Sequence, residues 1–165
     1  MIISSSCHVL FSFLAIFDVG MNNLEGSVPT ELYQLSNLKE LVLGGNADLT
    51  GNINSDLGFF TSLETLSLGP SQFTGTLPQF LFDFVELTEL TLAGAAFSGT
   101  LSEDFSRLDR LETLLLNNNT FTGSIPAAFD SMIELSEYFH LLDYLHCYIK
   151  NTCSHSPLTF RLQVR

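Results

Sequence analysis

The residues best suited to chemistry gather near the carboxyl end of the chain. Two histidines and two cysteines lie there: His146, Cys147, Cys153 and His155. Imidazole nitrogens and thiolates are usual zinc ligands, but the spacing here matches none of the common zinc patterns. We therefore expect no metal site and no cofactor. The two cysteines could close a small loop in an oxidising compartment or remain reduced thiols.

Signatures of catalysis are missing elsewhere in the sequence. There is no phosphate-binding loop, GxGxxG fingerprint, nucleophile elbow or HExxH motif. The adjacent acids Glu103 and Asp104 should diverge on the surface rather than converge on a substrate. The sequence therefore predicts a protein that is not an enzyme.

The negative charge of the chain limits the classes of partner that it can bind. The net charge is −12, and residues 1–135 hold sixteen acids against Lys39, Arg107 and Arg110. Such a surface repels phosphate backbones and anionic lipids, so we expect no nucleic-acid or membrane-surface binding. The acids either keep the chain soluble or form an electrostatic site for a partner.

One stretch, residues 111–126 with the sequence LETLLLNNNTFTGSIP, supplies a frame that recurs along the chain. Written as LxxLxLxxNxLxGxIP, it can be laid over residues 14–135. Its glycine recurs at intervals of 25, 24, 24 and 24 residues, at Gly26, Gly51, Gly75, Gly99 and Gly123. A fixed period of this length is typical of a leucine-rich-repeat solenoid.

The frame predicts the course of each repeat. Its alternating LxL segment predicts a short strand with leucines pointing inward, and stacked copies predict a parallel sheet on the concave side of a horseshoe. The GxIP segment has β character, and the apolar residues that follow at three-residue spacing suit a 3₁₀ turn on the convex side. The expected fold is an α/β solenoid of about five 24-residue repeats.

Two columns of residues should hold the turns and the interior together. The predicted hydrogen-bonding ladder reads Asn22, Asn46, Ser71, Ala95 and Asn119. Alanine offers no hydrogen bond, so the fourth repeat is expected to use water or to accept a looser turn. The predicted apolar column reads Leu24, Leu49, Phe73, Phe97 and Phe121. Phenylalanines at the apolar node of a repeat favour core packing over a ligand cage.

The ends of the chain depart from the frame. Residues 1–13 are apolar and read as a secretory signal or a partial cap, but the run at residues 9–17 is too short to span a membrane as a helix. Residues 136–165 diverge, and a helical stripe over residues 135–149 predicts a cap over the last repeat. A truncated or mispredicted reading frame would also explain both ends.

The segments NNLEGSVP, SQFTGTLP and NTFTGSIP resemble the plant-type leucine-rich repeats of receptor-like kinases and polygalacturonase-inhibiting proteins. The resemblance covers residues 14–135, although the family's usual amino-terminal cap, with paired cysteines around a tryptophan, is absent. It implies a non-catalytic recognition module for a protein or peptide, extracellular or at the cell surface as part of a larger protein, with a cytoplasmic location left open. Asn118 opens an N-glycosylation sequon, although the ladder already demands asparagine next to it.

The candidate site is the concave sheet face, because a solenoid aligns one exposed side chain per repeat there. The candidate partner-binding residues are Lys39, Glu64, Glu89, Thr91, Glu112, Thr113, Leu115 and Asn117. The face is small, hydroxylated and mildly acidic, without the aromatic and arginine anchors typical of strong interfaces. The alternative is a structural element with no ligand, whose uncapped ends stack on other repeats or on another copy.

Overall fold

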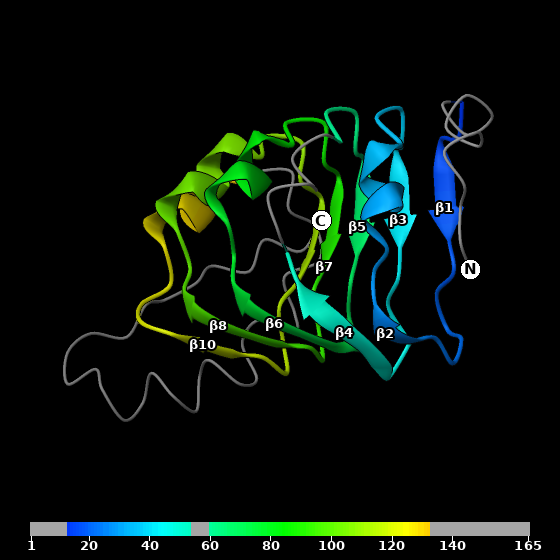
Figure 1. Ribbon diagram of the computed structural model, residues 1–165. Helices are drawn as coiled ribbons and strands as arrows, with labels where there is room; N and C mark the ends of the chain where they lie inside the picture. The colour runs from blue at the N-terminus through cyan, green and yellow to red at the C-terminus, as the bar shows by residue number, and fades with distance from the viewer. Residues whose placement is uncertain (1–12, 54–59, 133–165) are drawn as a thin grey trace, which may run out of the picture.

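The fold is a coil built from a repeated pair of short parallel strands (Figure 1). The computed structural model describes residues 13–53 and 60–132. The first sheet, in the order β1-β3-β5-β7-β9, consists of β1 (Ile16–Asp18), β3 (Glu40–Val42), β5 (Thr65–Ser67), β7 (Glu89–Thr91) and β9 (Thr113–Leu115). The second sheet, in the order β10-β8-β6-β4-β2, consists of β2 (Glu25–Ser27), β4 (Asp48–Asn52), β6 (Gln72–Thr76), β8 (Ala96–Thr100) and β10 (Thr120–Thr122). The predicted parallel solenoid is confirmed.

Short 3₁₀ helices follow the second-sheet strands, as the three-residue apolar spacing predicts. They are η1 (Thr30–Gln34), η3 (Gln79–Asp83), η4 (Glu103–Arg107) and η5 (Ala127–Ser131). Figure 1 shows η3, η4 and η5 stacked beside one another. Proline precedes three of these helices, where its fixed φ suits the entry and its missing N–H costs nothing. Where Ser102 replaces proline, its Oγ accepts a hydrogen bond from the Asp104 N–H at 3.1 Å.

The strands of the second sheet begin earlier in the repeat than the GxIP segment suggests. Strand β6 starts at Gln72, includes the apolar node Phe73 and ends at Thr76, one residue after the glycine. The strand stops short of Pro78 because proline cannot donate to a sheet ladder. In β4, β6, β8 and β10 the apolar node therefore belongs to the strand itself, and its side chain is buried.

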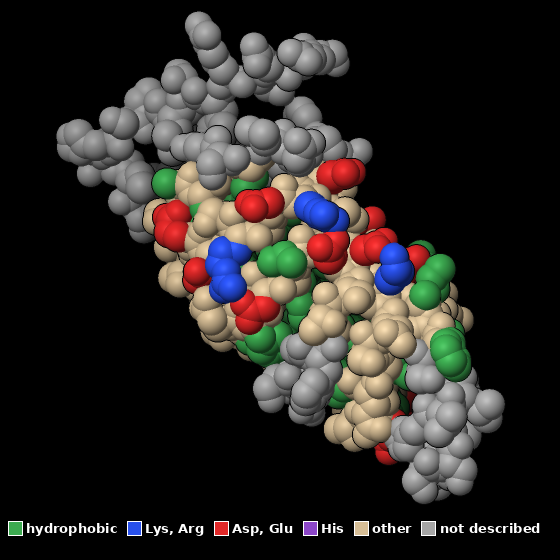
Figure 2. Space-filling model, turned by 90° about the horizontal axis from the view of Figure 1, so that it is seen from above, with side chains coloured by type: hydrophobic (Ala, Val, Ile, Leu, Met, Phe, Trp, Pro, Cys, Tyr) green, Lys and Arg blue, Asp and Glu red, His purple; other side chains and the backbone are tan. Residues whose placement is uncertain are grey.

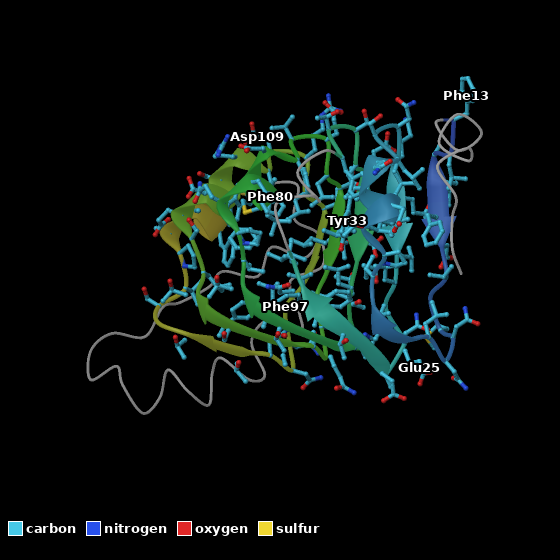
Figure 3. The ribbon with its side chains drawn as sticks, viewed as in Figure 1. Phe13, Glu25, Tyr33, Phe80, Phe97 and Asp109 are labelled. Atoms are coloured by element: carbon cyan, nitrogen blue, oxygen red, sulfur yellow. The ribbon has the colours of Figure 1, made fainter. Side chains whose placement is uncertain are left out.

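The core is a stack of leucines and phenylalanines enclosed between the two sheets and the 3₁₀ helices. Leu41, Leu66 and Leu90 are completely buried, and Figure 3 shows Phe97 inside the coil. On the convex side, the Phe105 ring stands edge-on to Phe82 and Phe129, with centroids 5.1 and 5.0 Å apart. Each such pair adds about 1 kcal/mol beyond the burial of its area.

The first repeat is the exception to this burial. Leu24, expected in the apolar column, is 41% exposed, whereas the equivalent Leu49 and Phe97 are 5% and 0% exposed. Among the described residues, β1 and β2 stand at the end of their sheets where no earlier strand packs against Leu24, whereas Phe121, in the last strand of the second sheet, is 8% exposed.

Asparagines tie neighbouring repeats together through their side-chain amides. The Asn46 Nδ2 donates to the carbonyl oxygens of Leu43 at 2.6 Å and of Val19, one repeat earlier, at 3.0 Å. Its Oδ1 accepts from the Leu24 N–H at 3.0 Å. Asn119 repeats this arrangement in the last described repeat. One buried side chain thus satisfies three backbone groups that a turn would otherwise leave without partners.

At Ala95, where the asparagine ladder is interrupted, a serine of the preceding repeat supplies the missing hydrogen-bond acceptor. The Phe97 N–H reaches an asparagine in the next repeat, but the equivalent group of Phe73 would face Ala95. The Phe73 N–H instead donates to the Ser71 Oγ of its own turn, at 3.3 Å. Serine two residues earlier thus replaces the missing acceptor for this amide of the third repeat, while the expectation that the fourth repeat uses water or a looser turn stays a prediction.

We predict that Asn46→Ala lowers the free energy of unfolding by about 3 kcal/mol, because three hydrogen bonds of roughly 1 kcal/mol each are lost at a completely buried side chain. The measurement is urea denaturation followed by circular dichroism. The matched control is Asn22→Ala, an exposed ladder residue with bonds only to its own turn, which should cost less than about 1 kcal/mol. Equal losses in the two variants would contradict the ladder as the source of stability.

Candidate functional site

The candidate site is the outward face of the first sheet together with the residues that flank its strands, here called the concave face. Strand pairing places Ile16, Glu40, Thr65, Glu89 and Thr113 in one row across the sheet. A second row consists of Asp18, Val42, Ser67, Thr91 and Leu115. The residue between the two rows of each strand faces the core. The structure therefore aligns the rows that the repeat frame predicts. Successive residues of one row lie one strand spacing, about 4.8 Å, apart.

Two of the candidate residues are bound to each other. The Lys39 Nζ lies 2.6 Å from the Glu64 Oε1, and both side chains are about half exposed. The hydrogen bond and the charge of Glu64 raise the pKa of Lys39 above its usual value. The pair is a bridge between neighbouring repeats, so it removes one cation and one acid from the charge that a ligand would meet.

The remaining candidates give the concave face its acidic and hydroxylated character. The Thr91 Oγ1 donates to the Glu89 carboxylate at 3.3 Å, which orients that acid over the sheet. Thr113 and Leu115 are half-buried on β9, and Glu112 is exposed just before that strand. The carbonyl of the remaining candidate, Asn117, accepts from the Gly94 N–H at 2.9 Å.

Every basic side chain in residues 13–53 and 60–132 is paired with an acid of a neighbouring repeat. Besides Lys39, the Arg107 guanidinium lies 2.5 Å from Asp83, and Arg110 contacts Glu86. Figure 2 shows the Lys and Arg side chains set among Asp and Glu side chains. Exposed pairs of this kind stabilise little, but they leave the other acids as the dominant charge of the surface.

Glu103 and Asp104 diverge, as expected, and each acts in packing. The Glu103 carboxylate accepts from the N–H groups of Ala127 and Ala128, at 3.1 and 2.8 Å, at the start of η5. The Asp104 carboxylate accepts from Gln79 in the preceding repeat, and this hydrogen bond, followed by the one from the Ser102 hydroxyl, lowers the pKa of Asp104. Sequence reasoning treated both as solvated charges, although serine in place of proline before this turn was a signal of capping.

Neither a metal-ligating cluster nor a membrane-spanning helix occurs in the described part of the chain. It contains no cluster of histidine, cysteine and acidic side chains arranged to hold a metal ion. His146, Cys147, Cys153 and His155 lie outside the described residues, as do the predicted cap helix and most of the amino-terminal segment. Nor does any helix within residues 13–53 and 60–132 reach the length and apolarity needed to cross a membrane.

Asn118 is exposed in the turn between β9 and β10, with a φ of 56°. The equivalent residues Met21, Gly45 and Gly94 also have positive φ, at 53°, 80° and 72°. Asparagine tolerates this left-handed conformation better than most residues. The backbone alone therefore explains why asparagine stands at this position, while its side chain remains accessible.

Comparisons with known proteins point in one direction. A family model for the Leucine Rich Repeat matches residues 110–132. Receptor-like protein 39 of Arabidopsis thaliana is 37% identical over 81 residues, which make up 48% of this chain and 9% of that protein. The ectodomain of the Arabidopsis thaliana receptor kinase GASSHO1/SCHENGEN3, in complex with CASPARIAN STRIP INTEGRITY FACTOR 2, has a TM-score of 0.73 and 33% identity, covering 81% of this chain and 16% of that one.

A second solved structure agrees with the first. The Arabidopsis receptor kinase HAESA, in complex with the peptide hormone IDA and the co-receptor SERK1, has a TM-score of 0.68 and 33% identity. The match covers 73% of this chain and 20% of the HAESA chain. The chain thus spans a fifth or less of the length of these relatives.

We predict that Glu64→Gln lowers the pKa of Lys39 toward its usual value, because both causes that raise it most come from Glu64. Since the pKa is raised in the folded state, the pair's contribution to stability is present below the ordinary lysine pKa and is lost as pH rises through the higher folded value. An NMR pH titration of the Lys39 side chain in both proteins measures the shift. Identical titration curves would show that the pair does not persist in solution.

Proposed function

This chain is a plant-type leucine-rich-repeat protein, and we propose that it is a non-catalytic recognition module that binds a peptide or protein on its concave face. The proposal includes an extracellular location, as part of a receptor-like or secreted protein. It is supported by the receptor ectodomains to which the chain is similar, two of which were solved with peptide or protein ligands. An extracellular location would also expose Asn118 to glycosylation, which its accessible side chain permits.

The single observation that carries the proposal is the alignment of the concave rows. Each strand offers its outward residues at the same height, so a partner that crosses the strands meets one side chain of each row at every step of about 4.8 Å. An extended peptide fits such a face because it needs many small contacts rather than one deep pocket. Gly44 and Gly69, which follow β3 and β5, keep the rows aligned, because a Cβ at either position would lie only 2.1 or 2.0 Å from a carbonyl oxygen of the next repeat.

The negative charge of the concave face favours a positively charged partner. Glu40 and Glu89 project from the same row on alternate strands, about 10 Å apart. Lys39 is already held by Glu64 and does not neutralise them. We therefore expect a cationic extended peptide, whose association should weaken as salt increases.

The test is a selection of peptides from a random display library on the full chain at low salt, followed by affinity measurement of the enriched sequences. We predict enrichment of lysine and arginine, and a roughly tenfold weaker affinity, equivalent to about 1.4 kcal/mol, for the variant Glu89→Lys. Asp48→Lys, on the second sheet, is the matched control because it makes the same charge change away from the concave face. It should leave the affinity within about twofold.

Two results would contradict the proposal. Failure to enrich any peptide that binds the soluble chain would argue against peptide recognition by these repeats. Enriched peptides that lose affinity equally with both variants would show that net charge, rather than the concave face, governs binding.

A further inference from the structure

Three asparagines follow β9 in succession, and the structure gives their side chains different environments. They are Asn117, Asn118 and Asn119. The Asn119 amide donates to the carbonyl oxygens of Leu92 and Leu116, at 2.8 and 3.0 Å, as a rung of the ladder. Asn117 is half-buried. Asn118 is exposed, and its amide makes no hydrogen bond within the described part of the chain. Asn118 therefore offers the most accessible amide of the run.

The sequence distinguishes the same residue. N-linked glycosylation requires a serine or threonine two positions after the asparagine. Thr120 stands two positions after Asn118, whereas the other two asparagines are followed at that distance by Asn119 and Phe121. No other Asn-x-Ser/Thr triplet occurs in the 165 residues. The single acceptor motif of the chain thus coincides with its exposed asparagine.

The column of the repeat frame to which Asn118 belongs leaves room beside it. The earlier members of this column are Met21, Gly45, Pro70 and Gly94. A Cβ at Gly45 would lie 2.5 Å from the Met21 Sδ. At Gly94 it would lie 3.2 Å from the Pro70 Cβ. Each of these two larger side chains therefore lies against a glycine of the next repeat. Because Gly94 precedes Asn118 in the column, no side chain at this position of the preceding repeat presses on Asn118.

We propose that Asn118 carries an N-linked glycan. The inference rests on the proposed extracellular location, because this modification belongs to secreted chains. The donor is an oligosaccharide joined to a lipid through a diphosphate. The Asn118 Nδ2 forms a bond to the anomeric carbon of the sugar while the bond from that carbon to the diphosphate breaks. The amide nitrogen gives up one proton, and the lipid diphosphate leaves.

The threonine of the motif places the transfer before folding. In the fold, the Thr120 Oγ1 donates to the Phe97 carbonyl oxygen of the preceding repeat, 2.8 Å away. The hydroxyl that the motif requires is therefore engaged once these repeats have stacked. The sugar is attached to the chain before the fifth repeat folds. The folded repeat then tolerates it, because the Asn118 side chain stays in solvent.

The attachment point lies past one side of the concave face. Strand pairing puts Thr113 in the row of Glu40 and Glu89. Along the same strand, Leu115 belongs to the second row, and Asn118 follows three residues later. The sugar is therefore attached beyond the second row, on the side of the face that lies farther from the glutamates. A bulky, solvated group there is compatible with peptide binding at the acidic row.

The experiment is expression of the full chain behind a cleavable secretory leader in eukaryotic cells. Intact mass spectrometry is done before and after a peptide N-glycosidase acts in heavy-oxygen water, which leaves a labelled aspartate at the attachment site. We expect the protein to lose the mass of an oligosaccharide, with the label at residue 118. Asn118→Gln and Thr120→Ala should each abolish the loss, and Thr120→Ser should retain it. Asn117→Gln is the matched control, because it makes the same change one residue earlier and should also retain it.

A chain that enters the secretory pathway without gaining a sugar would overturn the proposal. Protein retained inside the cell is analysed in the same way, because transfer precedes export. A mass loss that survives Asn118→Gln, or one that Asn117→Gln abolishes as well, would also contradict it. Peptide binding is measured separately on chain made in bacteria, which lacks the sugar. Binding by that chain together with an unmodified secreted protein would reject the glycan and leave peptide recognition standing.

Discussion

Each repeat of this solenoid must satisfy the backbone groups that its tight turn withdraws from the sheets, and the rest of the structure depends on how it does so. Asn46 and Asn119 meet the requirement with one amide that spans two repeats. Ser71 meets it within its own turn, so the alanine of the next repeat is tolerated. Because the turns are held, the strands stay in register, and the outward residues of the first sheet line up as a surface.

The repeat period also determines which polar side chains of neighbouring repeats contact one another. Residues that are 24 or 25 positions apart lie side by side, so Lys39 meets Glu64 and Arg107 meets Asp83. Hydroxyls follow the rule, since the Thr50 Oγ1 donates to the Gly26 carbonyl at 3.1 Å on the second sheet. Side chains that look available for function therefore hold neighbouring repeats together. What is left over for a partner is the acidity of the concave face and the apolar edge of the first repeat.

These two surfaces differ in the interaction they favour. The concave face is polar and shallow, which suits a ligand that makes many weak contacts and is attracted by charge. The outer end of the first repeat exposes apolar side chains among the described residues, which favour contacts that depend on burial rather than on charge. Salt should therefore weaken binding to the concave face more than a contact made through apolar side chains. A single chain can carry both surfaces because a solenoid separates its face from its end.

The sequence alone determined the solenoid, its parallel sheet, the inward leucines and the composition of the concave rows, because an apolar pattern with a fixed period allows only one way of stacking. It also identified Asn46 and Asn119 as ladder residues. Tertiary structure decided where the second-sheet strands begin, which acid holds Lys39, how Ser71 replaces a missing amide, and that Glu103 caps η5. A repeat frame places residues as neighbours, but the rotamers and turn geometry of a particular stack select which atoms meet.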